Sequence, residues 1–404
     1  MRRAALRFGT RAPRMASSVG LACRYGAPTM RFNAVNDRVN SPAVSMEFCS
    51  TAKSPANLTN GKFLNYAMLY HDSVAFLLCN DLGIPHWMST QERVTPMQVA
   101  DRFNLSCRAA SAFLVTLCRM DVVKVIEDDE NSVDEIEYGL TSSAHMFLSD
   151  RSSAAVTSPF IDTFNTNFIT PQRLLDCSRR VEQTDIMSEH LAQDDDAVAN
   201  NARHFMKHMN AQSYSCAQAL PRALGLDDNS EPTVLLDVGG GSAIYPIFAA
   251  KQSAHLTGIV YELPGIKPIT EEYIAEAGLS DRILVEAGDF FTADPFPSRV
   301  DLVLFANILH DWPDEINMQL LRKAYDCLNP GGRVVISELL LADDVKSSTS
   351  SATSMNVIMI PYTKGRQYRP KELFRRLSKL GFVAPTTTAL VDDYSLIVAR
   401  KPHK

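Results

Sequence analysis

The spacing of apolar positions predicts a helical first part of the chain. From Phe63 the run FLNYAMLYHDSVAFLLCNDLGI places apolar residues at helical intervals, and Gly83 and Pro85 follow it as stop signals. Thr95 has the residue type of a helix cap and Pro96 that of a first-turn residue, so a second helix is predicted there. Its expected buried face consists of Val99, Ala100 and Phe103.

A third helix and a hairpin follow in the pattern. Ser106 opens the helical run SCRAASAFLVTLCRMDVV, after which VVKVIED and IEYGLT read as two short strands around an acidic turn, residues 128–134. Helix, helix and hairpin form the order of a winged-helix domain, which can read DNA. The acidic turn would repel phosphate, and the presumed recognition helix holds only Arg108 and Arg119, so we expect a dimerisation role and no nucleic-acid partner.

The second part of the chain alternates strands with helices. A helix is expected from about Asp194 to Leu224, and beyond Thr233 the continuous apolar runs VLLDV, TGIVYE, RILVE, VDLVLFA and RVVISELLL are typical of a parallel sheet with both faces covered. One intervening helix, DEINMQLLRKAYDCLNPGG, is expected to end at its Asn-Pro-Gly-Gly stop. Its predicted buried face consists of Ile316, Leu320, Ala324 and Leu328. The fold class is therefore α/β, Rossmann-like, with a helical N-terminal domain.

These patterns divide the 404 residues into four segments. They are a leader over 1–56, a winged-helix dimerisation domain over 57–165, connecting helices over 166–230 and a catalytic domain over 231–404. Seven arginines precede the first acidic residue, Asp37, among Ser, Ala and Met, which is the composition of a transit peptide for mitochondrion or plastid. A disordered basic tail on a cytoplasmic protein is the alternative.

The overall composition favours a small-molecule substrate. Apolar residues make up 46% and charged residues 21% of the chain, and the formal net charge is -6, without the basic excess of a nucleic-acid binder. The eight cysteines contain no C-x-x-C pair, so we expect reduced thiols and no metal site. No apolar run is long enough to cross a bilayer, and no membrane association is expected.

Three sequence blocks predict a nucleoside-binding site. The strand VLLDV, which contains Asp237, runs into Gly239-Gly240-Gly241, where glycine lets the backbone turn tightly and approach a ligand. Glu262 ends the next strand, the place where an acidic side chain grips ribose hydroxyls, and Asp289-Phe290 after the following strand offers a carboxylate and an aromatic ring to adenine. An NAD site fits less well, because the loop lacks the G-x-G-x-x-G spacing and no second nucleotide half is evident.

His310 is the candidate general base. It stands in LHDWPDE just after the fourth strand of the α/β part, at the sheet end where such sites assemble. A positioned histidine that removes a proton typically adds about 100- to 10,000-fold in rate. The alternative is a helix-capping histidine beside Asp311 and Trp312.

The blocks LLDVGGG, VYELP, AGDFF, LHDWPDE and NPGGRVVISE, in this order, resemble the class I small-molecule O-methyltransferases that include caffeate and acetylserotonin O-methyltransferases. The resemblance spans about Leu58 to Lys401 and implies S-adenosylmethionine as cofactor, a small-molecule methyl acceptor and a homodimer. It implies cofactor contacts at Asp237, Gly239, Gly241, Glu262, Leu263, Asp289, Phe290, Ser213 and Asn307. It implies catalytic roles for His310, Asp311 and Glu338, and substrate contacts at Met209, Met359, Thr363 and Gln367.

This sequence departs from the family pattern around the histidine. The family flanks it with two glutamates; Glu338 matches the first, but Gln367 replaces the second and Tyr368 replaces an arginine. The position at which the family often carries Lys or Arg for the cofactor carboxylate is Ala306 or Asn307 in this chain. O-methylation with His310 as base is the first expectation.

Two further functional interpretations remain open. S-methylation of a thioether acid is the close alternative, since sulfur has no proton to lose. The run from Asn57 to Pro85 also resembles the branch that methylates 4-methylthio-2-hydroxybutyrate on the route to dimethylsulfoniopropionate. A non-catalytic winged-helix regulator that only senses the cofactor is the third interpretation.

Overall fold

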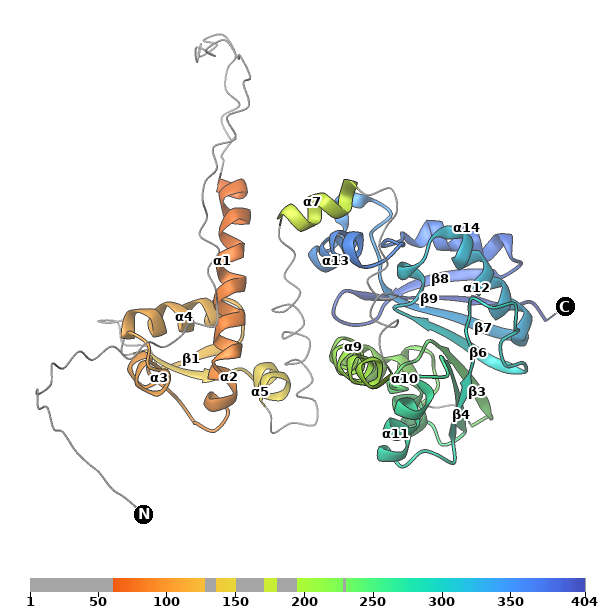
Figure 1. The fold of residues 1–404 in the computed structure, drawn as a ribbon, viewed down its shortest axis with the longest axis horizontal. Coiled ribbons are helices and arrows are strands. Elements are labelled where there is room, and N and C mark those ends of the chain that lie inside the picture. The colour runs from red at the N-terminus through yellow and green to blue at the C-terminus, as the bar shows by residue number, and fades with distance from the viewer. Residues whose placement is uncertain (1–60, 128–135, 150–170, 180–194, 228–229, 404) are drawn as a thin grey trace, which may run out of the picture. The chain divides into compact units, whose positions relative to one another are not determined.

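The computed structural model describes residues 61–127, 136–149, 171–179, 195–227 and 230–403 (Figure 1). The predicted leader and the acidic turn of the hairpin lie outside these ranges. The helical part contains α1 (Gly61–Asp81), α2 (Ile84–Met88), α3 (Pro96–Phe103), α4 (Cys107–Arg119), β1 (Val123–Glu127), β2 (Glu137–Leu140) and α5 (Ser142–Leu148).

Capping residues set the starts of these helices. The Thr95 side chain caps α3 in a reciprocal box with Gln98, and Ser106 caps α4, so both predicted starts are confirmed. Pro85 was expected to mark the end of a helix, but it lies in the first turn of α2. Proline is tolerated there because the N–H it lacks would have no intrahelical partner.

The helical part has a hydrophobic core of its own. β1 and β2 pair as an antiparallel hairpin, and Tyr138 of β2 is buried against α3 and α4. The core consists of Cys79, Ile84, Met88, Val94, Val99, Ala100, Ala110, Leu114, Leu117, Val122, Val123, Tyr138 and Ala144. Helix, helix and hairpin thus occur in the predicted order, while the proposed boundaries of the domains stay predictions.

The α/β part supplies the sheet and most helices. Before the sheet come α7 (Pro171–Arg179) and α9 (Asp195–Ala223). The strands are β3 (Thr233–Val238), β4 (Leu256–Glu262), β5 (Ile283–Ala287), β6 (Val300–Ala306), β7 (Leu328–Leu339), β8 (Val383–Ala389) and β9 (Tyr394–Arg400). Between them lie α10 (Ile244–Gln252), α11 (Lys267–Glu276), η1 (Leu309–Asp311), α12 (Asp314–Cys327), η2 (Val345–Ser347), α13 (Ser350–Tyr362) and α14 (Pro370–Lys379).

The seven strands form one sheet in the order β5-β4-β3-β6-β7-β9-β8. The first five strands are parallel, as predicted, but β9 runs antiparallel to β7 and β8 antiparallel to β9. From β3 the chain adds β4 and β5 on one side of the sheet and then β6 and β7 on the other. The switch point therefore lies between β3 and β6, and ligands of open α/β sheets bind at the carboxyl end of such a point. The expectation of a parallel sheet was wrong at the edge formed by β9 and β8.

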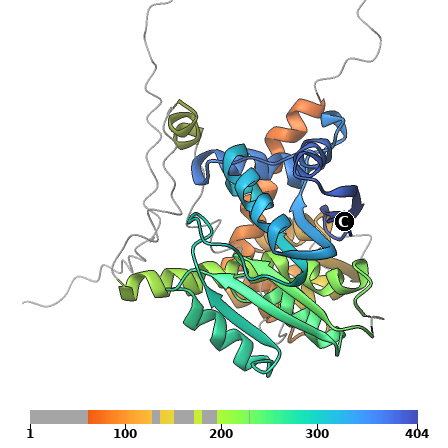
Figure 2. The same cartoon turned by 90° about the vertical axis from the view of Figure 1, so that its right-hand side faces the viewer.

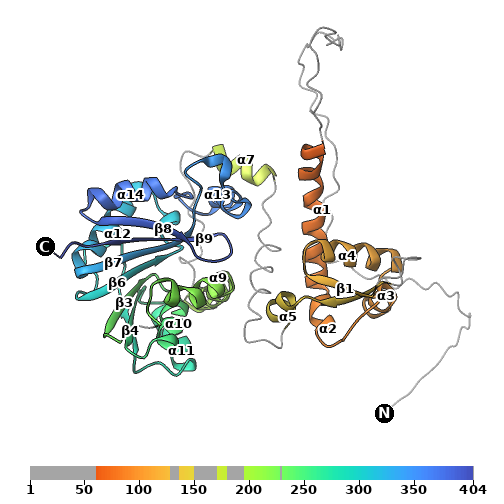
Figure 3. The same cartoon turned by 180° about the vertical axis from the view of Figure 1, so that it is seen from behind.

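Side chains from alternate strand positions build a core on each face of the sheet. On one face Leu235 of β3 packs with residues of α9, α10 and α13. On the other face Leu236 packs with residues of α12 and α14. The helices on either side of the sheet can be followed in Figures 2 and 3. The sheet is thus covered on both faces, and its carboxyl edge is where loops can form a site.

The helix α12 ends earlier than its pattern predicted. Leu320 and Ala324 are buried and Ile316 is half-buried, but Leu328 is already the first residue of β7. The Asn-Pro-Gly-Gly segment lies within β7, since the helix stops at Cys327. Within the described ranges no helix combines the length and apolarity that a membrane span requires.

Candidate active site

The glycine loop after β3 is packed so closely that side chains are excluded at two of its positions. Gly239 has a positive φ of 68°, and a Cβ there would lie 2.8 Å from Ile308 Cδ1. A Cβ on Gly240 would lie 2.5 Å from Asp237 Oδ2. Gly241 also has a positive φ, 53°, but faces open space. Ile308 and Asp237 therefore pack closely against the loop at Gly239 and Gly240, whereas Gly241 leaves room for a ligand.

Glu262, at the end of β4, binds the glycine loop directly. Its Oε2 accepts a hydrogen bond of 3.0 Å from Gly241 N, and its Oε1 one of 2.8 Å from Leu263 N. Thr270 Oγ1 donates to Gly241 O at 2.6 Å from the other side. Burial raises the pKa of Glu262, against the lowering effect of the two backbone donors. Each carboxylate oxygen still has a second acceptor position for a ligand hydroxyl.

Asp237 is a buried carboxyl group with an unpartnered oxygen. It is 1% exposed, and its Oδ2 has no hydrogen-bond partner within the described protein. Burial, with a smaller contribution from the Glu262 charge, raises the pKa of Asp237 to about 8. A cationic or hydrogen-bonding ligand at the glycine loop would satisfy this oxygen.

We expect Asp237→Asn to stabilise the cofactor-free protein increasingly as pH rises. Because the folded pKa of about 8 exceeds the reference value of 3.8, the folded state binds more protons than the unfolded state between these values. The penalty for ionising Asp237 is therefore absent at low pH and complete above about pH 8. Urea unfolding at pH 9 should show a gain of roughly 1–3 kcal/mol over wild type.

The control for this variant is Asp281→Asn, at an exposed position. It should behave like wild type at both pH 5 and pH 9. An Asp237→Asn effect of the same size at both pH values would contradict the assignment.

The segment after β5 places aromatic rings beside the glycine loop. The Phe290 ring centroid lies 6.0 Å from that of Trp312, and Phe291 lies 4.7 Å from both. Phe290 also lies 3.8 Å from the Cβ position of Gly239, so this ring borders the loop. Asp289 Oδ1 accepts a 2.8 Å bond from Phe291 N, which fixes its carboxylate in a tight turn.

Helix α9 lies next to the glycine loop. Asn210 accepts a hydrogen bond from the Ser242 hydroxyl, and Met206 packs with Leu263. Ser213, one turn further along α9, is 4% exposed, and Met209 is half-buried. Met209 and Ser213 therefore lie on a helix that contacts the glycine loop, and their contacts with substrate and cofactor stay predictions.

The turn after β6 carries His310. Asn307 adopts a positive φ of 54°, tolerated by asparagine, and its N donates 3.1 Å to Ser337 O of β7. The next residue, Ile308, reaches the glycine loop at Gly239. The histidine turn and the cofactor-side loop are thus in direct contact.

His310 is buried, 6% exposed, and polar groups of Gln367, Asp311 and Asn307 lie near its ring. Gln367 Nε2 lies 2.9 Å from Nδ1, and Asp311 Oδ1 lies 3.6 Å from Nε2. Burial lowers the pKa of His310 to about 4, although the Gln367 amide and the Asn307 carbonyl act in the opposite direction. His310 is therefore neutral at physiological pH.

Glu338, in β7, binds the backbone of the histidine turn. Its Oε1 accepts a 3.1 Å bond from His310 N, and the amides of Ile308 and Leu309 also lower its pKa. Burial nevertheless raises the pKa of Glu338 to about 7. This carboxyl group thus positions the backbone of His310, whereas Gln367 contacts its ring.

A buried hydrogen-bond network of Asn317 and Tyr368 also holds the turn that carries His310. Asn317 Nδ2 donates to the carbonyls of Leu309 and Trp312, at 2.9 and 3.0 Å, and to Tyr368 Oη at 2.9 Å. The Tyr368 hydroxyl donates 2.8 Å to Trp312 O. Tyr368, in the place of the family arginine, thus fixes the backbone of the histidine turn through its hydroxyl.

Gly365 permits the loop that carries Gln367 to approach His310. A Cβ at Gly365 would lie 2.1 Å from His310 O and 2.5 Å from Trp312 N, both of them backbone atoms. Gln367 N donates 3.0 Å to Asn356 Oδ1 of α13, which fixes the loop from the other side.

We expect Gly365→Ala to destabilise the fold by about 1–3 kcal/mol, since backbone atoms must move to admit the methyl group. Urea unfolding should detect this loss, and the His310–Gln367 contact should weaken with it. Gly265→Ala is the control, because a Cβ there meets nothing within 4 Å. Equal stability of the two variants would contradict the close packing.

The remaining predicted substrate contacts lie in and after α13. Met359 and Thr363 are buried, and Thr363 Oγ1 accepts from Gly365 N at 3.3 Å. Thr363 is therefore joined to the loop that reaches His310. Met209 and Met359 stand on different helices, α9 and α13.

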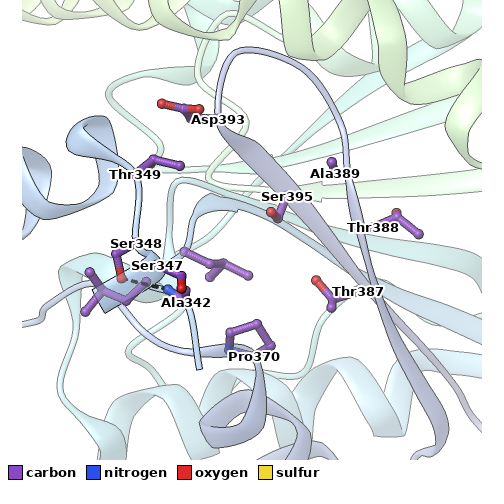
Figure 4. A pocket seen from close by; sticks show the side chains of 12 residues that line it. Ala342, Ser347, Ser348, Thr349, Pro370, Thr387, Thr388, Ala389, Asp393 and Ser395 are labelled. Carbon is purple, nitrogen blue, oxygen red and sulfur yellow. Dashed lines mark hydrogen bonds between the residues drawn. The ribbon is translucent and has the colours of Figure 1, made fainter. Parts of the chain in front are cut away.

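A separate surface depression of about 250 Å³ lies at the tip of the β8–β9 edge (Figure 4). The small polar side chains of Ser347, Ser348, Thr387, Thr388 and Ser395 line it, and Ser348 Oγ accepts from Ala342 N at 2.9 Å. Neither the glycine loop nor His310 lines it, so it does not belong to the site described above.

Three functional contacts were not foreseen from the sequence. Asn210, Thr270 and Asn317 are polar residues on helices, and nothing in the local pattern separates them from solvent-facing positions. Their roles arise from tertiary contacts with the glycine loop and the histidine turn.

The site has the features expected for a nucleoside ligand that carries a positive charge. Glu262 offers acceptors beside Gly241, Asp237 holds an unpartnered buried oxygen, and Phe290 supplies an aromatic face. Within the described ranges no cluster of His, Cys, Asp and Glu could hold a metal ion. These residues fit S-adenosylmethionine.

Comparison with known proteins supports the same fold and family. Residues 187–383 match the family model for an O-methyltransferase domain. The chain is 38% identical over 203 residues to L-tyrosine C(3)-methyltransferase of Streptomyces lavendulae, covering 49% of this chain and 54% of that protein. It is 44% identical over 138 residues to 3-hydroxy-5-methyl-1-naphthoate 3-O-methyltransferase of Streptomyces sahachiroi, covering 34% and 39%.

The chain thus spans about half the length, or less, of these curated relatives. The crystal structure of human N-acetylserotonin methyltransferase in complex with S-adenosylmethionine superposes with a TM-score of 0.68 at 20% identity, covering 86% of this chain and 99% of that one. Residues 187–383 therefore match an O-methyltransferase domain over just under half of the chain, and the fold that contains them is that of the class I S-adenosylmethionine-dependent methyltransferases.

Proposed function

We propose that this chain is an S-adenosylmethionine-dependent methyltransferase acting on a small-molecule acceptor. The observation that carries the proposal is the contact between the glycine loop and the turn of His310. The glycine loop is bound by Glu262, and Ile308 joins it to the turn of His310. Methyl transfer requires the cofactor and the acceptor atom to be aligned, and a fixed contact between their two loops supports such alignment.

In this proposal different residues of the chain bind the cofactor and position His310. Glu262 binds the ribose hydroxyls, Asp237 faces the charged amino-acid end, and Phe290 packs on adenine. Glu338 and Asn317 hold the backbone around His310, so that its ring faces the acceptor from a fixed position. The bound cofactor supplies an electrophilic methyl group on a sulfonium. Alignment alone can contribute on the order of 7–11 kcal/mol in well-oriented systems.

Two acceptor atoms are candidates. A hydroxyl oxygen agrees with the family name and requires His310 as base, since the proton must leave. A thioether sulfur requires no base, and the contact of a neutral amide, Gln367, with the His310 ring favours it. Relatives that methylate carbon and oxygen show that family membership leaves the acceptor atom open.

Transfer of label from S-adenosylmethionine to a panel of phenols, N-acetylserotonin and methylthiohydroxybutyrate tests the proposal. Methylation of one class identifies the acceptor. His310→Ala then separates the two chemistries: a reaction that uses the base loses about 100- to 10,000-fold, whereas a thioether reaction loses little. Cofactor binding without any transfer would instead support the regulator interpretation.

We also propose a homodimer formed through the helical part. Helix α1 leaves Leu69, Tyr70, Val74 and Leu78 between 40% and 53% exposed. Tyr70, Val74 and Leu78 follow one another at four-residue intervals and so form an apolar stripe. Light scattering on the full chain should give a dimer, and Val74→Lys should give a monomer. Met97→Lys, at an apolar position on α3 that is 59% exposed, is the control and should stay dimeric.

A further inference from the structure

The segment that carries Phe290 lies between β5 and β6 and is anchored at both of its ends; it is called here the Phe290 turn, residues 288–296. At one end Gly288 N donates 2.9 Å to Glu262 O of β4, and at the other end the Phe296 side chain is buried in the core. Most of the residues between these anchors are exposed, and they form no helix or strand. The position of the Phe290 ring therefore depends on contacts that other elements make with this turn.

Lys323 of α12 makes such a contact with the backbone of the Phe290 turn. Its Nζ donates 3.0 Å to Phe290 O and 2.6 Å to Thr292 O, so a single ammonium group joins two carbonyls of the turn. The same ammonium lies 5.4 Å from the centroid of the Phe296 ring, within the range of a cation–π contact. Lys323 therefore links the turn to α12 at three points.

Helix α12 holds the histidine turn as well. Asn317, six residues before Lys323 on this helix, donates to two carbonyls of the histidine turn. At a rise of about 1.5 Å per residue, the two side chains leave the helix about 9 Å apart along its axis. One helix thus fixes the turn that carries His310 relative to the turn that carries Phe290.

We infer that Lys323 is a positioning residue for the cofactor, which holds the Phe290 turn in the conformation that packs on adenine. This inference rests on the proposed methyltransferase function and extends it to a residue outside the three nucleoside-binding motifs. An ammonium group suits the role because carbonyl oxygens only accept, and its three N–H groups serve both of them at once. Both bonds end on the Phe290 turn, so the effect belongs to the nucleobase end of the cofactor.

Ligand binding to the full chain tests the inference without a known methyl acceptor. Titration calorimetry uses S-adenosylmethionine and methylthioadenosine, which contains the nucleoside but lacks the amino-acid end. Lys323→Met keeps a side chain of similar length without a donor, and it should weaken the binding of both ligands by about tenfold. Lys323→Arg can donate to both carbonyls and should retain most of the affinity. Arg322→Met, at the exposed neighbouring position of α12, is the control and should bind like wild type.

The fluorescence of Trp312 reports on the Phe290 turn, because the rings of Phe290 and Phe291 lie against the indole. The chain has two tryptophans, so Trp87→Phe leaves Trp312 as the single emitting indole. In this background Lys323→Met should shift the emission of the cofactor-free protein to longer wavelength, since the released turn covers the indole less. Lys323→Arg should leave the emission unchanged.

The outcomes separate a positioning role from a merely structural one. Weaker binding of both ligands in Lys323→Met, with rescue by Lys323→Arg, supports the inference. A loss of stability in urea with unchanged affinity and emission would overturn it, and so would weaker binding of S-adenosylmethionine alone. Failure of the wild type to bind either ligand would refute the proposed function itself, whereas normal binding by Lys323→Met refutes the inference and leaves that function standing.

Discussion

Replacement of Glu262 by alanine is expected to weaken the binding of S-adenosylmethionine by at least about 100-fold. The carboxylate accepts from Gly241 N and Leu263 N, so its loss removes two charge-assisted bonds that shape the loop. It also removes the proposed ribose acceptors. Hydrogen bonds to charged groups contribute about 1.5–3 kcal/mol each, and 1.4 kcal/mol is tenfold in affinity. Titration calorimetry of the purified chain measures the change.

Two further variants show whether the loss belongs to the carboxylate. Glu262→Gln keeps one acceptor and should bind with intermediate affinity. Glu271→Ala removes an exposed glutamate of α11 that pairs with Lys267 at 3.6 Å, and this variant should bind like wild type. Wild-type affinity in Glu262→Ala would refute the placement of the ribose.

The second large effect is expected from Gln367→Glu, which should raise methyl transfer to hydroxyl acceptors by about 100-fold or more. A carboxylate at this position requires a proton on Nδ1 of His310 and leaves the Nε2 lone pair free. Its charge also stabilises the imidazolium that forms when the base acts. Transfer to a thioether should change little, because that reaction moves no proton. Initial rates with labelled cofactor on both acceptor classes provide the comparison.

The gain in Gln367→Glu must depend on the histidine. The double variant Gln367→Glu with His310→Ala should lose it, and Gln367→Met should never acquire it. Cofactor affinity, measured in each variant, shows that the glycine loop is intact. A variant that binds cofactor as wild type does, yet gains nothing on hydroxyl acceptors, would contradict the assignment of His310 as a latent base.

Much of the fold could be predicted because the parallel strands are buried on both faces. The apolar runs that end in Val238, Glu262 and Ala306 stand out from any surface segment, and all three proved to be strands. The two C-terminal strands were not predicted. β8 contains a proline and three threonines and is mostly exposed, so its sequence resembles a loop.

Only those parts of the site that belong to short contiguous motifs could be predicted from the sequence. The glycine loop, Glu262 and His310 belong to motifs that are contiguous in the sequence. The bonds of Asn317 to Leu309 and Tyr368 join residues that are 8 and 51 positions apart, and no local pattern marks them. The contact of Glu338 with a backbone amide was equally hidden, since matching a motif identifies a residue but not the atom it binds.

The contact of Ile308 with Gly239 bears on the order in which the two reactants bind. A single aliphatic side chain extends from the turn that presents the histidine to the loop that would receive the cofactor. Ligand binding that fixes the glycine loop would also fix Ile308, and with it the turn that carries His310. Kinetically, this favours an ordered mechanism in which the acceptor binds productively only after the cofactor. A free acceptor would then be a poor competitor for the cofactor-free enzyme.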